Sequence, residues 1–352
     1  MTFAPETGPA DWKGSEIDAR EGLYCLSAAE LDEIETAIDG VVGADLPEIT
    51  AARFPLPSLA PRLAGLGEDL RLGRGFVLLR GLSRERFGLD GMARALYGIG
   101  VHIGAPTPQS WHGELLGNVV DVSDRESTAR GYQTGGGQRM HSDSCDIIAL
   151  MCVHPAKSGG ESRISSAVAV HNAILERRPD IAERLYRGFV YRRMERDAAL
   201  GSGVLVTAPV PTFSTESGVL SCHTSGSYPR RAFDAGDAVP DELANEALDL
   251  LAQLAVSPEF HLDMVIGEGD IQFLNNRRML HGRLDYEDYP ELDRRRHMLR
   301  LWLNMPSWPA LPAAQVVHGP ADHANWLRQR RPFMEIPSTY LAEMAGRAAV
   351  AA

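Results

Sequence analysis

Residues 138–150, QRMHSDSCDIIAL, place His141 and Asp143 two positions apart, directly before an apolar run. Side chains at positions i and i+2 of a β-strand point to the same side, so this pair can face one site. A chain with 11 histidines is expected to contain an H-x-D by chance, and a second one occurs here at His261 and Asp263. The motif alone therefore leaves two interpretations open, a metal site and the start of an ordinary buried strand.

The charge of the chain argues against a nucleic-acid partner. Its 352 residues carry a formal net charge of -12, from 47 acidic and 35 basic side chains. A protein that binds a phosphate backbone needs a basic surface to replace the counterions. We therefore expect a small-molecule substrate and no nucleic acid, while a homo-oligomer stays possible. At this length the chain can bury a large core in one or two domains.

The cysteines and the N-terminus indicate the compartment. Cys25, Cys145, Cys152 and Cys222 form no C-x-x-C pair, which argues against a zinc knuckle or a disulfide framework and fits a reducing environment. The first residues contain no basic segment followed by an apolar one, and no run of 18 apolar residues occurs. We expect a cytoplasmic protein without a membrane partner.

The residue pattern predicts strands with helices inserted between them. A capping box at Ser27 and Glu30 predicts a helix that begins there. Further helices are expected over 88–100, 166–186 and 240–256, and strands over 75–81, 146–154, 161–166, 188–194, 218–224, 270–276 and 297–304. Because strands and helices do not alternate strictly, the fold class is α+β, built on an antiparallel sandwich or barrel.

A third metal ligand is available far along the chain. A site with two histidines and one carboxylate suits Fe(II), because it leaves coordination positions open for a co-substrate and O₂. His281, in the stretch NNRRMLHGR, is the candidate third ligand for His141 and Asp143. His261 is the weaker candidate, since the hairpin partner of its strand already contains His281. We interpret His261 as a strand residue at a loop edge.

The stretch RRRHMLRLWL has a period of two. Arg296, Met298 and Arg300 share one strand face in this pattern. An arginine on an inward face is costly unless it meets an anion, and a guanidinium suits a carboxylate. Taken alone, a solvent-facing role that adds only solubility is equally consistent with the pattern.

In this order and spacing, four stretches carry a family resemblance: HSD, PAKSGGESRISS, GDIQFLNNRRMLHGR and RRRHMLRLWL. The sequence resembles the taurine dioxygenase and 2,4-dichlorophenoxyacetate dioxygenase (TauD/TfdA) family, the clavaminate-synthase-like branch of Fe(II)/2-oxoglutarate oxygenases, over about residues 70–305. The resemblance implies a distorted double-stranded β-helix, or jelly roll, with surrounding and inserted helices. It divides the chain into an N-terminal extension (1–70), the oxygenase domain (71–310) and a C-terminal extension (311–352).

The resemblance implies a catalytic iron centre of His141, Asp143 and His281, with 2-oxoglutarate and O₂ as co-substrates. The implied reaction oxidises an unactivated C–H bond and releases succinate and CO₂. Hydroxylation is the preferred outcome, because halogenating relatives lack the carboxylate ligand that this chain keeps. Desaturation or cyclisation by the same oxidant is an alternative. Two others are a non-catalytic jelly-roll binding protein, which has no need for a keto-acid anchor, and a zinc hydrolase, for which no general base is evident nearby.

The resemblance also assigns the co-substrate residues. Arg296, 15 residues after His281, falls where the family binds the distal carboxylate of 2-oxoglutarate, and Ser165 falls where a hydroxyl assists it. Arg295 is a rival, because the spacing varies by one residue among relatives. We favour Arg296 because it shares a strand face with Arg300.

The substrate residues are the least constrained. Arg300 falls where relatives often meet an anionic group, which suggests a small anionic or amino acid-like substrate. The stretch RGYQTGGGQRM is interpreted as a lid that presents Tyr132, Gln133 or Gln138, although its glycines can equally serve only a turn. Tyr228 and Arg230 lie in a polar loop that can contact the substrate or can equally be a solvated turn. Asn276 and Arg277 are candidates for support of the distal ligand. We interpret His154, His171 and His297 as structural residues.

Overall fold

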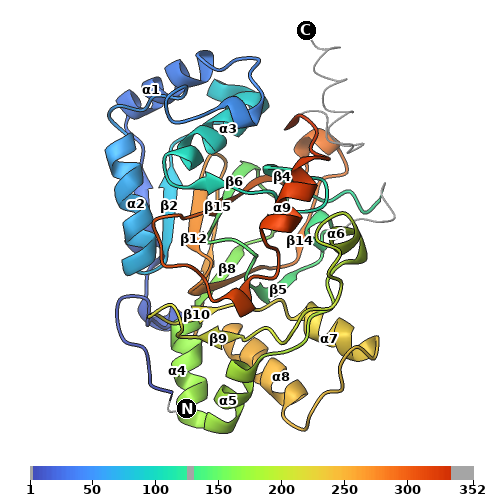
Figure 1. The fold of residues 1–352 in the computed structure, drawn as a ribbon. Coiled ribbons are helices and arrows are strands. Elements are labelled where there is room, and N and C mark those ends of the chain that lie inside the picture. The colour runs from blue at the N-terminus through green and yellow to red at the C-terminus, as the bar shows by residue number, and fades with distance from the viewer. Residues whose placement is uncertain (1–2, 125–130, 334–352) are drawn as a thin grey trace.

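Two antiparallel sheets form the centre of the molecule in the computed structural model, which describes residues 3–124 and 131–333 (Figure 1). The larger sheet has seven strands in the order β1-β2-β12-β6-β15-β3, with β4 also paired to β15. Only β1 and β2 are parallel within it. Its strands are β1 (Leu23–Cys25), β2 (Phe76–Arg80), β3 (Ala105–Pro106), β4 (Leu116–Val120), β6 (Ile147–His154), β12 (Ile271–Asn275) and β15 (His297–Asn304).

The smaller sheet has four strands in the order β11-β8-β13-β5. These are β5 (Gln138–His141), β8 (Ser162–Ser166), β11 (His261–Met264) and β13 (Met279–Arg283). Side chains from both sheets line one internal cavity, among them Met298 of β15 and His281 of β13. The chain is therefore α+β with two facing sheets, as in a jelly roll. Two short two-stranded sheets lie outside them, one of β7 (Ser158–Gly159) with β14 (Tyr286–Glu287) and one of β9 (Phe213–Ser214) with β10 (Ser221–Cys222).

Successive side chains of the central strands point alternately into two hydrophobic cores, one on each face of the larger sheet. On β6, Ile147, Ala149 and Met151 join the core beneath α1 (Ala28–Asp39), α2 (Ala60–Leu72) and α3 (Arg84–Val101). Ile148, between them, belongs to the core that includes the smaller sheet. That core also holds α4 (Ala167–Arg177), α5 (Pro179–Arg187) and α8 (Ala244–Ala255). The larger sheet is thus buried on both faces, which explains why its strands read as continuous apolar runs.

Most expected elements are present, and the exceptions have local causes. The capping box predicted at Ser27 is confirmed, since its hydroxyl accepts from the backbone N–H of Glu30. The single helix expected over 166–186 is wrong: α4 and α5 are separate, because Pro179 cannot donate a backbone hydrogen bond and disfavours helical geometry at Arg178. The strand expected over 188–194 contains only isolated bridges, and the one over 218–224 shrinks to β10.

The N-terminal segment takes part in the core. It contributes β1 at one edge of the larger sheet, and α1 and α2 to the helical layer. Near the other end, α9 (Pro320–Leu327) buries Trp326. The remaining short helices are α6 (Glu195–Ala199) and α7 (Ser227–Asp234). Division of the chain into domains at residues 70 and 310 stays a prediction.

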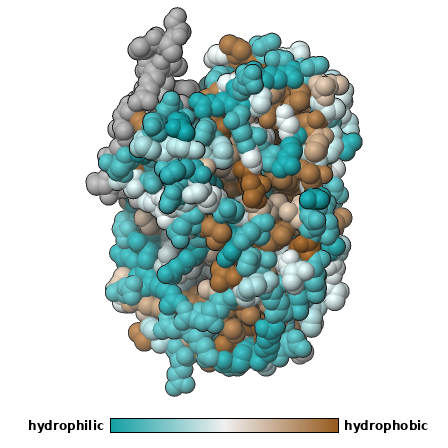
Figure 2. Space-filling view, turned by 180° about the vertical axis from the view of Figure 1, so that it is seen from behind, coloured by the Kyte–Doolittle hydropathy of each residue, from teal (hydrophilic) through white to brown (hydrophobic). Residues whose placement is uncertain are grey.

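The surface seen from behind is mostly hydrophilic, interrupted by smaller hydrophobic groups (Figure 2). This agrees with the many charged residues of the sequence. Within residues 3–124 and 131–333, no helix combines the length and the apolar character needed to cross a membrane.

Candidate metal centre and active site

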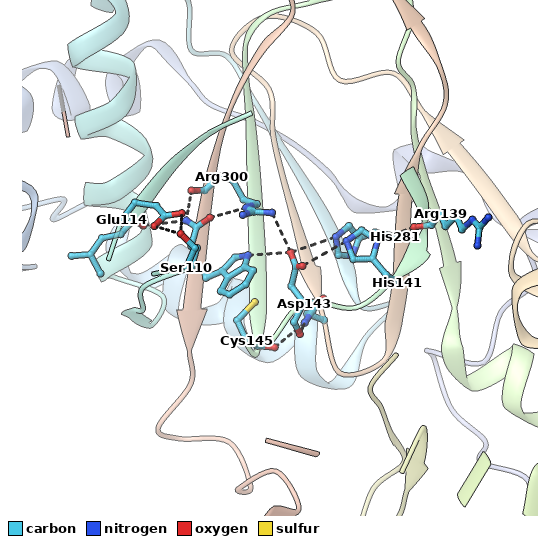
Figure 3. A network of polar contacts seen from close by, with 12 residues as sticks. Ser110, Glu114, Arg139, His141, Asp143, Cys145, His281 and Arg300 are labelled. Carbon is cyan, nitrogen blue, oxygen red and sulfur yellow. Dashed lines mark hydrogen bonds and ion pairs between the residues drawn. The ribbon is translucent and has the colours of Figure 1, made fainter. Parts of the chain in front are cut away.

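Three potential metal ligands meet between the two sheets (Figure 3). His141 at the end of β5 is the register partner of His281 on β13, and the centroids of their rings are 4.3 Å apart. Nε2 of His141 lies 3.6 Å from Oδ1 of Asp143, and Nε2 of His281 lies 3.7 Å from Oδ2. One donor atom from each residue falls within 4.8 Å of the other two, the one such group found in the described residues.

The strand expected to carry both His141 and Asp143 ends at His141. Asp143 lies in the following loop, where Asn276 holds its backbone. The side-chain oxygen of Asn276 accepts from Asp143 N–H at 3.0 Å, and its amide nitrogen donates to the carbonyl of Asp143 and, at 2.9 Å, to that of Cys145. Asn276 is therefore close to a candidate ligand, although it contacts Asp143 rather than the distal histidine.

The two imidazoles present their Nε2 atoms to Asp143. Nδ1 of His141 lies 2.8 Å from the carbonyl oxygen of Arg139, and because a carbonyl can only accept, Nδ1 carries the proton. Nδ1 of His281 is buried without a hydrogen-bond partner among the described residues. His141 is thus oriented by its own strand, with Nε2 directed at Asp143, where a metal ion could replace a proton on this nitrogen.

The charges of the group suit a divalent cation. Burial alone would raise the pKa of Asp143, but His141, Arg300 and His281 outweigh it and hold that pKa far below its usual range. Burial and the neighbouring His141 lower the pKa of His281 to about 3. Burial also disfavours the charged form of His141, but the adjacent Asp143 raises its pKa overall. The ionised carboxylate of Asp143, the neutral imidazole of His281 and the imidazole of His141 together form a set of donors suited to a metal ion.

The distances between the histidine nitrogens and the carboxylate oxygens of Asp143 also leave room for a metal ion. At 3.6 and 3.7 Å, the two histidine-to-carboxylate distances are too long for hydrogen bonds. Two ligands that each bind one ion at about 2.0–2.2 Å lie roughly 3–4 Å apart. The three residues therefore match a metal site better than a hydrogen-bonded cluster.

A narrow cavity of about 40 Å³ extends from the two histidines between the sheets. Arg296, the residue before β15, lines it, and its Nη1 is buried without a partner in the described part of the chain. Burial and the nearby Arg283 lower the pKa of Arg296. Arg295 takes a different direction, with its Nη2 2.7 Å from Oδ2 of Asp124. The structure thus brings Arg296 to the cavity, and the rival Arg295 does not line it.

The serine expected beside Arg296 needs a correction. His281 is the register partner of Ile164, so the even-numbered residues of β8 share its inward face. Ser162 lines the cavity, whereas Ser165 lies on the opposite face, paired with Leu280. The assignment of Ser165 was wrong because the position was counted along the motif without the strand register. We transfer the proposed role to Ser162.

A second, wider cavity of about 360 Å³ opens on the other side of the candidate ligands. Four of the expected substrate residues line it: Tyr132, Gln138, Tyr228 and Arg300. Arg230 does not, because it faces α8, where its Nη2 lies 2.7 Å from Oδ1 of Asp249. Arg277 is also turned away from the ligands and binds Asp146, with its Nε 2.7 Å from Oδ1.

Arg300 is held at the junction of the two cavities. Its Nε donates to Oε1 of Gln109 at 2.7 Å, while Nε2 of Gln109 donates to the Arg300 carbonyl at 2.7 Å. The rings of Tyr132 and Trp302 lie 4.7 and 5.1 Å from its guanidinium carbon. Its Nη1 is 3.8 Å from Oδ2 of Asp143. The sequence pattern had identified this face of β15 but not Gln109.

Several lining residues were missed, among them Trp302, Gln109 and His223, for different reasons. Trp302 follows Arg300 by two positions, so the period-2 pattern of β15 contained its signal. Gln109 and His223 come from segments without periodicity, and only the tertiary structure brings them to the wider cavity.

The second H-x-D motif lies apart from this site. Nδ1 of His261 is 2.8 Å from the carbonyl of Ser257, and Asp263 pairs with Arg163 at 2.7 Å. The other histidines interpreted as structural contact local groups. These contacts are His154 with the carbonyl of Pro155, His171 with Asn172 and Tyr186, and His297 with Asn118.

Two facing sheets, an inward His-Asp-His group and a buried arginine whose Nη1 has no partner in the described residues are the features expected of a non-haem iron oxygenase that uses 2-oxoglutarate. Residues 43–302 match the family described as taurine catabolism dioxygenase TauD, TfdA family, and the chain belongs to that family. It is therefore an oxidoreductase, as the sequence motifs predicted.

Similar proteins have related names. FR-33289 synthase of Streptomyces rubellomurinus is 29% identical over 328 residues, covering 89% of this chain and 94% of the relative. Taurine hydroxylase-like protein SAT17 of Stachybotrys chartarum is 30% identical over 311 residues, covering 82% and 77%.

Two solved structures share the fold. Asparagine oxygenase in complex with Fe(II), 2S,3S-3-hydroxyasparagine and succinate has a TM-score of 0.62 at 17% identity, covering 80% of this chain and 93% of that one. The non-heme iron oxygenase OrfP in complex with Fe and alpha-ketoglutaric acid has a TM-score of 0.60 at 14% identity, covering 82% and 99%.

Proposed function

We propose that this protein hydroxylates an unactivated C–H bond of a small anionic or amino acid-like substrate, using Fe(II), 2-oxoglutarate and O₂ and releasing succinate and CO₂. The observation that carries the proposal is the convergence of His141, Asp143 and His281 beside Arg296, whose buried Nη1 has no hydrogen-bond partner among the described residues. A metal site alone would fit many reactions. A buried guanidinium with an unused donor next to that site calls for an anionic co-substrate.

The protein's own residues would hold each participant in place. His141, Asp143 and His281 would bind the iron, and Arg296 with Ser162 would bind the distal carboxylate of 2-oxoglutarate. When bound, iron and 2-oxoglutarate supply the oxidising power for C–H cleavage with O₂. The co-substrate would lie in the narrow cavity between the sheets and the substrate in the wider one, and the two cavities share His141 and Arg300 in their linings.

The wider cavity supports the proposed substrate class. Arg300 is the lining residue with a permanent positive charge, and Asp143, the acidic one among the described residues, would be a metal ligand. The polar side chains of Gln138, Tyr132 and Tyr228 also line it. Relatives are named for taurine and for uridine-5'-phosphate, and a structural neighbour contains hydroxyasparagine. These names support a small polar substrate with an acidic group.

Hydroxylation is proposed over halogenation because Asp143 occupies the position that a halide ligand would need. The carboxylate is fixed there by Trp302, whose Nε1 donates to Oδ2 at 3.1 Å. The 3-hydroxyasparagine in the structural neighbour is in keeping with this outcome. Desaturation or cyclisation would begin at the same C–H bond. The mass of the product distinguishes these reactions from hydroxylation.

The decisive experiment is a substrate screen that measures succinate. Purified protein with Fe(II), 2-oxoglutarate and O₂ is offered small carboxylates, sulfonates, phosphonates, phosphate esters and amino acids. We expect one class to stimulate succinate release, with a product 16 mass units heavier than the substrate, the mass of one oxygen atom. His141→Ala is the matched control and should give no stimulation. Metal-loaded protein that neither binds 2-oxoglutarate nor forms succinate would contradict the proposal.

A further inference from the structure

Arg283 carries a second buried guanidinium with unused donors. It is the last residue of β13, two positions after His281, and therefore shares the inward face of that strand. Its residue exposure is only 5%. One nitrogen, Nη2, donates to the carbonyl oxygens of Thr134, at 2.8 Å, and Gly136, while Nε and Nη1 have no partner among the described residues. Buried donors are almost always satisfied, so these two nitrogens indicate an acceptor that the described residues do not provide.

Arg283 lies beside Ser162 in the smaller sheet and lines the same cavity as Arg296, which precedes β15. Its register partner on β8 is Ser162, and both line the narrow cavity with Arg296. The Tyr286 ring centroid lies 4.7 Å from the guanidinium carbon of Arg283 and 5.3 Å from that of Arg296. The two cations therefore flank one aromatic ring, and each has at least one nitrogen free for a shared ligand.

The charge of this cavity calls for an anion. Its described lining contains Arg283, Arg296 and Arg300 and no carboxylate; Asp121, Asp285 and Asp288, the carboxylates that act on Arg283, lie outside this lining. Cations held this close in a desolvated space repel each other unless an anion compensates them. A carboxylate has two oxygens and about four acceptor positions, enough for both guanidiniums.

The spacing fits a five-carbon diacid. His281 and Arg283 are two residues apart on β13, which separates their Cα atoms by roughly 7 Å. This is comparable to the length of 2-oxoglutarate between its keto-acid end and its distal carboxylate. A co-substrate bound beside His281 and directed along β13 would therefore bring its far end to Arg283.

Building on the proposed function, we propose that Arg283 is a second co-substrate-binding arginine, which holds the distal carboxylate of 2-oxoglutarate together with Arg296. The competing role is structural: Arg283 would only support the loop that contains Thr134 and Gly136. The two roles differ in one measurable respect. Only a direct contact makes the effect of Arg283 depend on the distal carboxylate.

The test compares two ligands by isothermal titration calorimetry on Mn(II)-loaded protein. The ligands are 2-oxoglutarate and 2-oxopentanoate, which keeps the chain length and the keto acid but lacks the distal carboxylate. In Arg283→Gln, we expect the Kd for 2-oxoglutarate to rise about tenfold or more, because a charge-assisted contact is lost, and the Kd for 2-oxopentanoate to stay within about threefold. Equal weakening of both ligands, or no change in either, would overturn the proposal.

Two further variants make the result decisive. Arg283→Lys keeps the charge without the planar fork, so we expect an intermediate loss for 2-oxoglutarate only. It also replaces Arg283→Gln if circular dichroism shows that variant to be unfolded. Arg163→Gln is the matched control, because Arg163 lies on the neighbouring strand β8 and pairs with Asp263 away from the cavity. Wild-type protein that binds no 2-oxoglutarate would instead contradict the proposed function itself.

Discussion

The indole nitrogen of Trp302 donates a hydrogen bond to Oδ2 of Asp143 at 3.1 Å, across the gap between β15 and the loop after β5. Oδ2 is also the atom that lies 3.8 Å from Nη1 of Arg300. A buried carboxylate that receives such contacts keeps both its charge and its orientation. Trp302 is therefore a positioning residue for a proposed metal ligand.

Trp302→Phe should weaken Fe(II) binding by about tenfold, because groups that orient a metal ligand typically contribute 10- to 100-fold to affinity. Anaerobic titration of the apoprotein with Fe(II) measures this directly. Trp308→Phe is the matched control, since Nε1 of Trp308 has no hydrogen-bond partner in the described part of the chain. Equal Fe(II) affinity in the Trp302 variant and in wild type would show that the indole contact has no role in metal binding.

His141→Ala should abolish stoichiometric Fe(II) binding and turnover, because it removes one of the three proposed ligands. Metal content after reconstitution and gel filtration, together with succinate formation, provides the two readouts. His261→Ala serves as the comparison, because His261 belongs to the other H-x-D motif and contacts the carbonyl of Ser257. If the His261 variant lost the metal and the His141 variant kept it, the assignment of the centre would be wrong.

Arg296→Leu should raise the Kd for 2-oxoglutarate by a factor of at least about 30, since losing a buried charge-assisted pair costs about 2–5 kcal/mol. Calorimetry on the Mn(II)-loaded protein measures the change. Arg295→Leu should leave the Kd nearly unchanged, because Arg295 is engaged with Asp124. The reverse pattern would mean that the arginine on the other strand face binds the co-substrate.

Ser162→Ala should weaken 2-oxoglutarate binding by about tenfold, the usual effect of one hydrogen bond to a charged group. Ser165→Ala should not, because its hydroxyl lies on the opposite face of β8 without a hydrogen-bond partner among the described residues. Thermal unfolding of both variants checks that the fold is intact. Loss of affinity in the Ser165 variant alone would restore the assignment made from the motif.

Wild-type protein should give no chlorinated product even in excess chloride, because Asp143 already occupies the coordination position a halide would need. Mass spectrometry of the product formed with Fe(II), 2-oxoglutarate, O₂ and chloride tests this once a substrate is known. Asp143→Gly should lose most activity without becoming an efficient halogenase. A dominant chlorinated product from wild type would contradict both the ligand role of Asp143 and the proposed hydroxylation.

Local patterns predicted the central strands and the separation of side chains on β15. The strands β2, β6, β12 and β15 were recognisable because each is a short apolar run, and runs of this kind suit a sheet buried on both faces. The helix α1 was recognisable from its capping box. The short strand β10 and the break between α4 and α5 were not predicted, since tertiary packing and one proline decide them.

The sequence by itself determined which residues can bind a metal and that Arg296, just before β15, and Arg300, on β15, line the same cavity, because residue type and strand periodicity are local properties. Only the tertiary structure decided that Ser162 rather than Ser165 enters the cavity, since this depends on how β8 pairs with β13. It also decided that Gln109 holds Arg300, across 191 positions of the sequence. Contacts of this kind have no local signature, because they arise from the register of strands and the packing of loops that lie far apart in the chain.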